Sequence, residues 1–192
     1  MKRMGNLLLI GARGCGKSVV GRRTAALLGP AWRFVEMDRA LVDRLGMPIA
    51  EFFARHGENA FRAAESALLD EIARGARQVV ACGGGVGATP FSLDAARAAG
   101  TVVWLDTPEH ELIARRLADP NEPARPPLLP ELAALKAADL AAYLHVEVPS
   151  VLARRRGCYA GAHYVVATTG LDVDRLASIV AELALAHAPE DA

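Results

Sequence analysis

The residues from Gly11 to Ser18 have the types and the spacing needed to bind the phosphates of a nucleotide. They read Gly-Ala-Arg-Gly-Cys-Gly-Lys-Ser and fit the phosphate-loop pattern G-x-x-x-x-G-K-[ST] at every fixed position. In such a loop the backbone N–H groups point inward, and glycines let the main chain curl closely around the phosphates. We expect the ammonium of Lys17 to lie on the β- and γ-phosphates and the hydroxyl of Ser18 to bind Mg²⁺.

Two carboxylates occur at the end of the second apolar stretch. Glu36 and Asp38 lie two positions apart, a spacing that would place both side chains on one face of a strand. In doubly wound sheets, ligands bind beyond the carboxyl ends of the strands, which is where these acids would lie. The alternative is an ordinary strand-to-helix turn in which Asp38 is the N-cap of the helix.

An arginine and a run of glycines also suggest a binding site. Arg62 and Glu65 are spaced i, i+3 on a predicted helix and are close enough to pair, although a surface ion pair is the ordinary interpretation. Gly83, Gly84 and Gly85 directly follow a buried strand. Three glycines at such a position destabilise the chain unless the backbone must come close to something. The alternative is a flexible connector.

The stretch 119–130 is the most irregular part of the chain. It contains five prolines, with Arg125 among them, and indicates a loop. A mobile loop here would suit a lid that closes over a nucleotide. Residues 131–162 are rich in alanine and mainly helical in pattern, with Pro149 expected as a break and a run of three arginines at 154–156.

Five apolar stretches alternate with helical patterns and would position these residues. The predicted strands are 6–10, 33–37, 78–82, 101–105 and 163–167. The region 38–75 between the second and third strands is predicted to form helices. Its first helix has a predicted buried stripe of Ile49, Phe52, Phe53 and His56 and ends before Gly57. Five strands alternating with helices imply a parallel sheet covered on both faces, that is, a three-layer α/β/α domain over residues 1–192.

Composition and cysteine usage indicate the class of protein. Lys and Arg together number 22, as do Asp and Glu, so the net charge gives no reason to expect nucleic acid or a membrane as partner. The first apolar run ends at Gly11 and is too short for a signal peptide or a membrane span. Cys15, Cys82 and Cys158 have no metal-binding spacing, which indicates reduced thiols in a cytoplasmic protein. We expect a monomer.

Taken together, these residues resemble the shikimate kinase family over nearly the whole chain. The matching signatures, in chain order, are the loop ending Gly16-Lys17-Ser18, the acidic pair ending at Asp38, Gly46 with Ile49, Gly57-Glu58-x-x-Phe61-Arg62-x-x-Glu65, the triple glycine 83–85, the Arg-Pro…Leu-Leu lid at Arg125, and Arg155-x-x-x-Tyr159. The string from Gly57 to Glu65 and the triple glycine are far more specific than the phosphate loop. The resemblance implies a P-loop fold like that of the nucleoside monophosphate kinases. It also implies transfer of the ATP γ-phosphate to the 3-hydroxyl of shikimate, a step of aromatic amino acid biosynthesis.

The resemblance implies a role for each matching position. ATP would be bound by Gly14, Cys15, Gly16, Lys17, Ser18, Val19 and Arg125, and shikimate by Asp38, Arg62, Gly83, Gly84, Gly85 and Arg155. Lys17, Asp38 and Arg125 would be catalytic, with Asp38 at the acceptor hydroxyl. Ser18 and Glu36 would hold Mg²⁺, while Arg62 and Arg155 would bind the shikimate carboxylate. The acceptor region would span about 38–75 and the lid about 119–135.

The sequence departs from the family pattern at several places. Glu36 stands where the family usually has Asp, and the lid reads Arg125-Pro-Pro-Leu-Leu, with one additional proline. The segment between Arg125 and Arg155 is longer than in the family. Around 169–170 we find no counterpart of the polar or basic side chain that many relatives place near the adenine.

Two other functions are compatible with a phosphate loop. A kinase of another small polyol acid, such as gluconate, is one, but the string Phe61-Arg62-x-x-Glu65 argues against it. A non-catalytic module that senses a ligand or ATP is the other, suggested by the altered acidic pair and lid. The intact Lys17, Ser18 and Asp38, together with Arg62, argue against that alternative.

Overall fold

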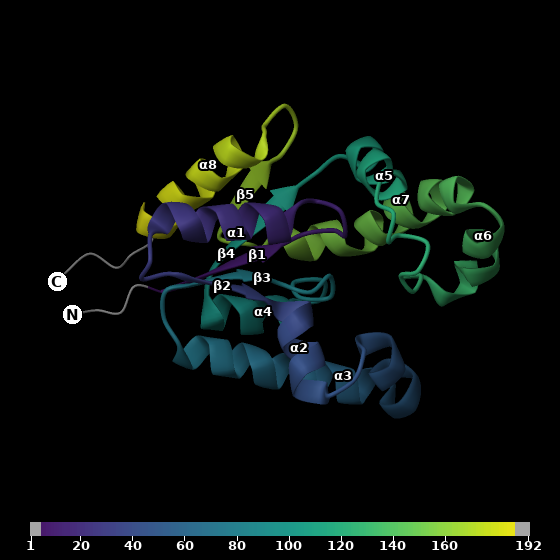
Figure 1. The fold of residues 1–192 in the computed structure, drawn as a ribbon, viewed down its shortest axis with the longest axis horizontal. Helices are drawn as coiled ribbons and strands as arrows, with labels where there is room; N and C mark the ends of the chain where they lie inside the picture. The colour runs from purple at the N-terminus through teal and green to yellow at the C-terminus, as the bar shows by residue number, and fades with distance from the viewer. Residues whose placement is uncertain (1–4, 187–192) are drawn as a thin grey trace.

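A five-stranded parallel sheet lies at the centre of the molecule (Figure 1). The computed structural model describes residues 5–186, so both ends of the predicted 1–192 domain lie outside the described residues. The strands are β1 (Asn6–Ile10), β2 (Arg33–Glu36), β3 (Gln78–Ala81), β4 (Gly100–Asp106) and β5 (Tyr164–Ala167). They stand in the order β2-β3-β1-β4-β5, and every neighbouring pair is parallel. The predicted parallel sheet is therefore confirmed.

The central strand β1 shows why the strands read as apolar runs. Its side chains from Leu7 to Ile10 are all fully buried. Successive side chains of a strand point to opposite faces of the sheet. Accordingly, Leu7 and Leu9 belong to one hydrophobic cluster, and Leu8 and Ile10 belong to the other. A strand covered on both faces needs apolar residues at every position, which removes any alternation from its sequence.

Helices cover both faces of the sheet and give the three predicted layers (Figure 1). One face packs against α1 (Lys17–Leu28), α5 (Glu109–Leu117), α7 (Leu140–Tyr159) and α8 (Val173–Ala186). The other face packs against α2 (Met37–Leu45), α3 (Ile49–Arg74) and α4 (Pro90–Ala99). The 3-10 helix η1 (Pro130–Leu132) and α6 (Ala133–Ala138) lie between α5 and α7 in the chain. The α/β/α architecture is thus confirmed.

Asp38 lies in the first turn of α2 and not on a strand. Because β2 ends at Glu36 and Met37 begins the helix, the expectation that both acids share one strand face is wrong. Met37 and Leu41 are spaced by four residues and are both fully buried. This helical spacing of core residues decides the conformation. Glu36 is the N-cap residue of α2, a position that the alternative interpretation assigned to Asp38.

The long helix α3 contains the predicted division at Gly57. Gly57 has φ 78° and ψ 177°, a conformation outside the helical region, and α3 is kinked at this residue. The expected buried stripe in the first part is wrong at Phe53, which is 40% exposed, and at His56, which is exposed as well, and Ile49 and Phe52 are only half-buried. This part of α3 extends past the sheet (Figure 1), so only one side of it finds a core to pack against.

Helix α7 continues through Pro149, where the sequence predicts a break. Proline removes one backbone donor from a helix and normally bends or ends it. Here Val148 and Val151 are buried on either side of the proline, and this packing holds both halves of the helix in place. The hydroxyl of Ser150 donates to the carbonyl of Val146 at 2.7 Å in the same turn. Neither α7 nor any other helix within residues 5–186 is long and apolar enough to span a membrane.

Candidate active site

The phosphate loop connects β1 to α1 at the carboxyl edge of the sheet. Gly14 and Gly16 have φ values of 90° and 97°, which side chains other than glycine rarely adopt. A Cβ added at Gly11 would also lie 2.8 Å from the carbonyl oxygen of Leu105 on β4. The loop therefore needs its glycines both for its own curvature and for its close approach to the neighbouring strand. Its backbone leads directly into the N-terminus of α1, where the helix dipole favours anions.

The amine of Lys17 lies across the phosphate loop. Its Nζ donates to the carbonyl oxygens of Gly11 at 2.9 Å and Ala12 at 3.0 Å, and it lies 3.7 Å from the Sγ of Cys15. Cys15 itself is buried and fills the space beneath the loop. The lysine ammonium is thus already in the loop that would surround a bound phosphate.

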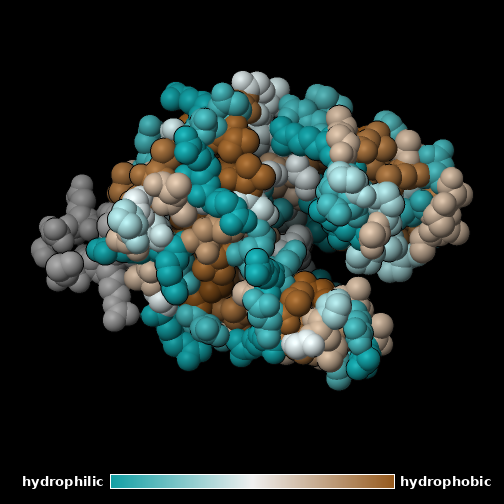
Figure 2. Space-filling model, in the orientation of Figure 1, coloured by the Kyte–Doolittle hydropathy of each residue, from teal (hydrophilic) through white to brown (hydrophobic). Residues whose placement is uncertain are grey.

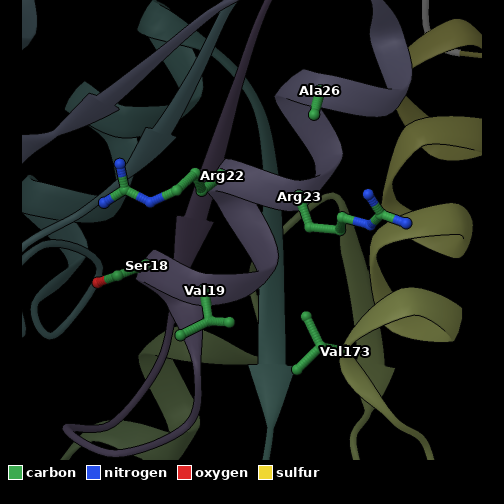
Figure 3. Close-up of a pocket in the computed structure, with 6 residues that line it drawn as sticks. All are labelled: Ser18, Val19, Arg22, Arg23, Ala26 and Val173. Carbon is green, nitrogen blue, oxygen red and sulfur yellow. The ribbon is translucent and has the colours of Figure 1, made fainter.

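A surface hollow of about 380 Å³ lies along α1 beside the phosphate loop (Figure 3). Its lining residues are Ser18, Val19, Arg22, Arg23, Ala26 and Val173. The two arginines point to opposite sides: Arg22 stacks over the ring of Phe34 at 4.7 Å, and Arg23 donates to Asp174 at 2.6 Å. Ser18 and Val19 are the predicted ATP-binding residues in this lining, and no predicted shikimate-binding residue contributes to it.

The triple glycine 83–85 follows β3 and is approached closely by charged side chains. A Cβ at Gly83 would lie 2.5 Å from Oδ1 of Asp38 and 3.5 Å from Oε1 of Glu65. A Cβ at Gly85 would collide with the guanidinium of Arg62. Side chains from two different helices therefore occupy the space that side chains at 83 and 85 would need. This close approach accounts for the glycines and argues against a mere flexible connector.

Arg62 is held by two carboxylates of its own helix. Its Nη1 pairs with Oε2 of Glu65, and its Nη2 lies 3.3 Å from Oε1 of Glu58. Glu65 is only 5% exposed, so the ordinary interpretation of a surface ion pair is wrong. Burial raises the pKa of Glu65, and its pairing with Arg62 offsets this only in part. Burial lowers the pKa of Arg62, but the two carboxylates outweigh burial and leave that pKa above its ordinary value.

The C-terminal part of α7 brings a second arginine to the glycines. Nη1 of Arg155 donates to the carbonyl oxygen of Gly84 at 2.6 Å. The hydroxyl of Tyr159, a fully buried residue, donates to the same oxygen at 3.4 Å. Asp38, Arg62 and Arg155 thus come from three helices and meet at one short stretch of backbone.

The buried Cys82 shows how many charges converge below this stretch. Burial raises the pKa of its thiol to about 12. The charge of Lys17 lowers this pKa, whereas the carboxylates of Asp38, Glu65 and Glu36 raise it further. The phosphate-loop lysine and the three acids therefore all influence the same thiol electrostatically. In the sheet, Glu36 at the end of β2 is in register with Ala81, the residue before this cysteine.

The residues predicted to hold Mg²⁺ have suitable donor chemistry. Within residues 5–186 no group of three or more His, Cys, Asp or Glu side chains is arranged to bind a metal ion. Mg²⁺ is usually held by one or two carboxylates together with substrate phosphates and waters, and it needs no such cage. The Ser18 hydroxyl and the Glu36 carboxylate fit this kind of site.

Arg125, in the segment predicted to form a lid, pairs with two carboxylates of that same segment. Its Nη2 lies 2.8 Å from Oδ2 of Asp119, and its Nη1 lies 3.3 Å from Oε2 of Glu122. This predicted lid segment contacts the phosphate loop directly, because Nη1 of Arg13 donates to the carbonyl oxygen of Pro126 at 3.0 Å. Figure 2 shows the surface hollowed between the part that contains α2 and the start of α3 and the part that contains α6.

Sequence reasoning missed two residues at these surfaces. Phe53 is partly exposed beside Phe61, with their ring centroids 5.6 Å apart, and Phe61 in turn lies under the guanidinium of Arg62. The helical spacing of Phe53 predicts a core residue, so no pattern marks it as a site residue. Arg13 occupies a variable position of the phosphate-loop pattern, which carries no signal for its contact with the lid.

Comparison with known proteins identifies the family that these features resemble. The family model for shikimate kinase matches residues 13–183. A shikimate kinase of Moorella thermoacetica is 33% identical over 178 residues, which cover 93% of each chain. The solved structure of a shikimate kinase from Acinetobacter baumannii in complex with shikimate is 29% identical and has a TM-score of 0.77, covering 96% of this chain and 95% of that one. A gluconokinase from Sinorhizobium meliloti is 18% identical with a TM-score of 0.58 over 97% of each chain, a likeness of fold alone.

Proposed function

The chain belongs to the shikimate kinase family, and we propose that it performs this family's reaction where the phosphate loop and the triple glycine meet at the carboxyl edge of its sheet. The reaction is the transfer of the γ-phosphate of ATP to the 3-hydroxyl of shikimate. The oxygen of that hydroxyl forms a bond to the γ-phosphorus, and the bond from that phosphorus to the bridging oxygen of ADP breaks. The observation that carries the assignment of the site is the convergence of Asp38, Arg62 and Arg155 on residues 83–85.

The donor side rests on the phosphate loop and the lid. We assign the binding of the ATP phosphates to the backbone of Gly14–Val19, where inward-pointing N–H groups and the N-terminus of α1 favour anions. Lys17 neutralises charge on the β- and γ-phosphates, and Arg125 adds a second positive charge from the lid. Phosphoryl transfer demands mainly positioning and charge neutralisation of this kind.

The acceptor side rests on the charged groups around the triple glycine. Two guanidinium groups, those of Arg62 and Arg155, match the carboxylate of shikimate, because a planar guanidinium binds a carboxylate through two parallel hydrogen bonds. Asp38 orients the acceptor hydroxyl and takes its proton as the new bond forms. The backbone of residues 83–85 fixes the ring between these groups, and the exposed Phe53 beside Phe61 offers an apolar wall.

Mg²⁺ accompanies ATP in this proposal. The Ser18 hydroxyl and the Glu36 carboxylate would hold it, the latter directly or through water. When bound, the ion supplies positive charge to the β- and γ-phosphates.

In this proposal the region 38–75 is the acceptor-binding part and the region 119–135 is the lid of one monomeric, cytoplasmic enzyme. Three free cysteines are in keeping with that compartment.

A coupled assay of ADP release tests this function. Purified protein with ATP and Mg²⁺ should turn over shikimate and should not turn over gluconate, with quinate as a third acceptor in the panel. Lys17→Ala is the matched control, because it removes the phosphate-loop ammonium and should abolish turnover without unfolding the protein. Turnover of gluconate without turnover of shikimate would refute the assignment. Binding of ATP without turnover of any acceptor would favour a ligand-sensing module.

A further inference from the structure

Ionic side chains that have no role in the acceptor site pack together at the base of the lid. We call this group the lid cluster: Arg13, Arg116, Glu122, Lys136, Tyr143 and Glu147. Glu122 and Glu147 are both 0% exposed, and Arg116 is 2% exposed. The cluster therefore holds charges that are almost completely removed from water, which is uncommon unless they are paired.

Glu147 on α7 is the centre of the hydrogen bonds in the lid cluster. Nη1 of Arg116 donates to its Oε2 at 2.5 Å. Its other oxygen, Oε1, accepts from the hydroxyl of Tyr143 at 2.5 Å and from the backbone N–H of Leu128 at 3.1 Å. Leu128 belongs to the lid, three residues beyond Arg125. One carboxylate of α7 therefore binds a side chain of α5 and the backbone of the lid at the same time.

The lid backbone is held from further directions as well. Nη2 of Arg116 donates to Oε1 of Glu122 at 2.6 Å. The amine of Lys136 on α6 donates to the carbonyl oxygens of Glu122, at 2.8 Å, and of Arg125. Arg13 of the phosphate loop donates to the carbonyl oxygen of Pro126. The stretch 122–128 is thus attached to the phosphate loop, α5, α6 and α7, with Arg125 in its middle.

Stability alone is a weak explanation for this arrangement. A buried ionic group is often no more stabilising than apolar side chains of similar volume, because taking the charges out of water is costly. The lid cluster also leaves Nε of Arg116 buried without a partner among the residues described. The hydrogen bonds fix the position of the lid backbone next to the phosphate loop, which apolar packing would not do.

We propose that Glu147 is a positioning residue for nucleotide binding. It holds Leu128 and Arg116, and through them it keeps the lid backbone where Arg125 can reach the phosphates of ATP. Its side chain does not touch the reacting atoms. Glu147, Tyr143 and Lys136 all lie in the segment between Arg125 and Arg155 that is longer than the family pattern. The proposal gives this added length a role, and it rests on the proposed function of Arg125 as a phosphate-binding residue.

The test measures the binding of nucleotides by calorimetry without shikimate. Glu147→Gln keeps the size of the side chain and removes its charge. It should weaken binding of a non-hydrolysable ATP analogue about tenfold, the effect of misplacing one hydrogen bond to a charged group. Binding of AMP should stay unchanged, since AMP has no β- or γ-phosphate for Arg125 to reach. Glu131→Gln is the matched control, because it removes a carboxylate at an exposed position of the same segment.

A double-mutant cycle separates positioning from general destabilisation. In an Arg125→Gln background, Glu147→Gln should cause no further loss of affinity for the ATP analogue, because the side chain that it positions is gone. Hydrogen exchange should show faster exchange of the Leu128 amide in the Glu147→Gln variant, with α8 unchanged. If Glu147→Gln fails to fold, Tyr143→Phe provides the same readout, since it removes one hydrogen bond to Glu147.

Two results would overturn the proposal. One is unchanged affinity for the ATP analogue in both the Glu147 and Tyr143 variants. The other is an equal loss of affinity with and without Arg125, which would mean that Glu147 acts by another route. A wild-type protein that binds the ATP analogue but does not turn over shikimate would refute the proposed function and leave this inference standing.

Discussion

Arg62 combines two demands that a single side chain rarely meets. In the proposed function it must stay positively charged and also remain available to the carboxylate of the ligand. The carboxylates of Glu58 and Glu65 hold its guanidinium in place. The two carboxylates raise the pKa of Arg62 above its ordinary value in spite of its partial burial. The string Phe61-Arg62-x-x-Glu65 predicts the pair from sequence, since i, i+3 neighbours meet on a helix. The burial of Glu65 was not predictable, because it depends on β3 and the triple glycine packing against that face of α3.

Asp38 and Arg62 should affect different kinetic constants. Asp38→Asn should lower kcat for shikimate, because it removes an interaction with the reacting hydroxyl. Arg62→Lys keeps the charge but loses the paired hydrogen bonds, so it should mainly raise KM for shikimate. The expected loss of binding free energy is about 1.5–3 kcal/mol. Steady-state kinetics with each substrate varied in turn measures both. A higher KM for ATP with an unchanged KM for shikimate in the Arg62 variant would place the acceptor elsewhere.

The triple glycine allows a test by the addition of one methyl group. Gly83→Ala would place a Cβ 2.5 Å from Oδ1 of Asp38, so the carboxylate must move. We expect kcat to fall by at least about tenfold, since the displaced carboxylate no longer meets the acceptor hydroxyl. Gly157→Ala is the control, because a Cβ there would have no described neighbour within 4 Å. Normal turnover in Gly83→Ala would contradict the role of Asp38 at the reacting centre.

Glu36 should act on the metal and not on the acceptor. Glu36→Gln should weaken the apparent Mg²⁺ affinity more than the affinity for shikimate, because an amide oxygen is a poorer ligand than a carboxylate. Glu36→Asp should be well tolerated, since it restores the residue usual in the family. Titration of turnover with Mg²⁺ at saturating shikimate gives the comparison. If the Mg²⁺ titration of the Gln variant matches that of the wild type, Glu36 does not bind the metal and has only a structural role as the N-cap residue of α2.

Among the secondary-structure elements, those buried on both faces were the most predictable. The strands pack between two hydrophobic clusters, so their sequences are apolar runs that predict buried strands directly. The start of α2 at Met37 and the continuity of α7 through Pro149 were not predictable in the same way. In both cases the packing of distant residues overrides the local signal of two spaced acids or of a proline. The lid cluster was not predicted for a similar reason, since Arg13 lies more than a hundred residues before the other members and the rest come from three helices and the lid.

The anchoring of α7 to the lid should make the stability of the protein depend on acidic pH. Burial raises the pKa of Glu147, but the hydrogen bonds from Arg116 and Tyr143 outweigh burial and hold that pKa below the ordinary value of 4.5. The ionised group therefore stabilises the fold above about pH 4.5, and this stabilisation is lost as the pH falls through the lowered pKa.

Urea unfolding of the wild type and of Glu147→Gln measures this contribution. At neutral pH the variant should be less stable by on the order of 3 kcal/mol, because it breaks a buried ion pair. The difference between the two proteins should shrink as the pH is lowered below about 4.5, and the exposed-site variant Glu131→Gln should show no such trend. A difference that stays constant down to the acid limit of folding would contradict a lowered pKa of Glu147.

In the proposed function, the phosphate loop and the lid bind ATP, and the charged groups around the triple glycine bind shikimate. Helix α7 contacts both regions. It carries Glu147 in the lid cluster and Arg155 on Gly84, eight residues further on, and a helix rises about 1.5 Å per residue, or about 12 Å over this distance. Figure 1 shows α7 running from the side of α6 back toward the sheet.

Because α7 contacts both binding regions, we expect the two ligands to bind cooperatively. A ligand that fixes the position of α7 at one region would lower the free-energy cost of binding at the other, so each should bind more tightly in the presence of the other. By linkage, the factor by which ADP tightens shikimate must equal the factor by which shikimate tightens ADP. Calorimetry of each ligand with and without the other measures both factors. If each factor equals one, the two sites are independent.

The continuity of α7 at Pro149 has a consequence for this cooperativity. At the joint between the two halves, Pro149 lacks a backbone donor, and the buried Val148 and Val151 and the hydrogen bond from Ser150 to Val146 support the helix there. Pro149→Ala restores the donor and should preserve or strengthen the mutual tightening of ADP and shikimate. Pro149→Gly restores the same donor but has a lower helix propensity than alanine, so it should preserve the mutual tightening less well than Pro149→Ala, with each ligand's separate affinity unchanged. A proline that ought to break the helix would then be the point at which communication between the two substrates is adjusted.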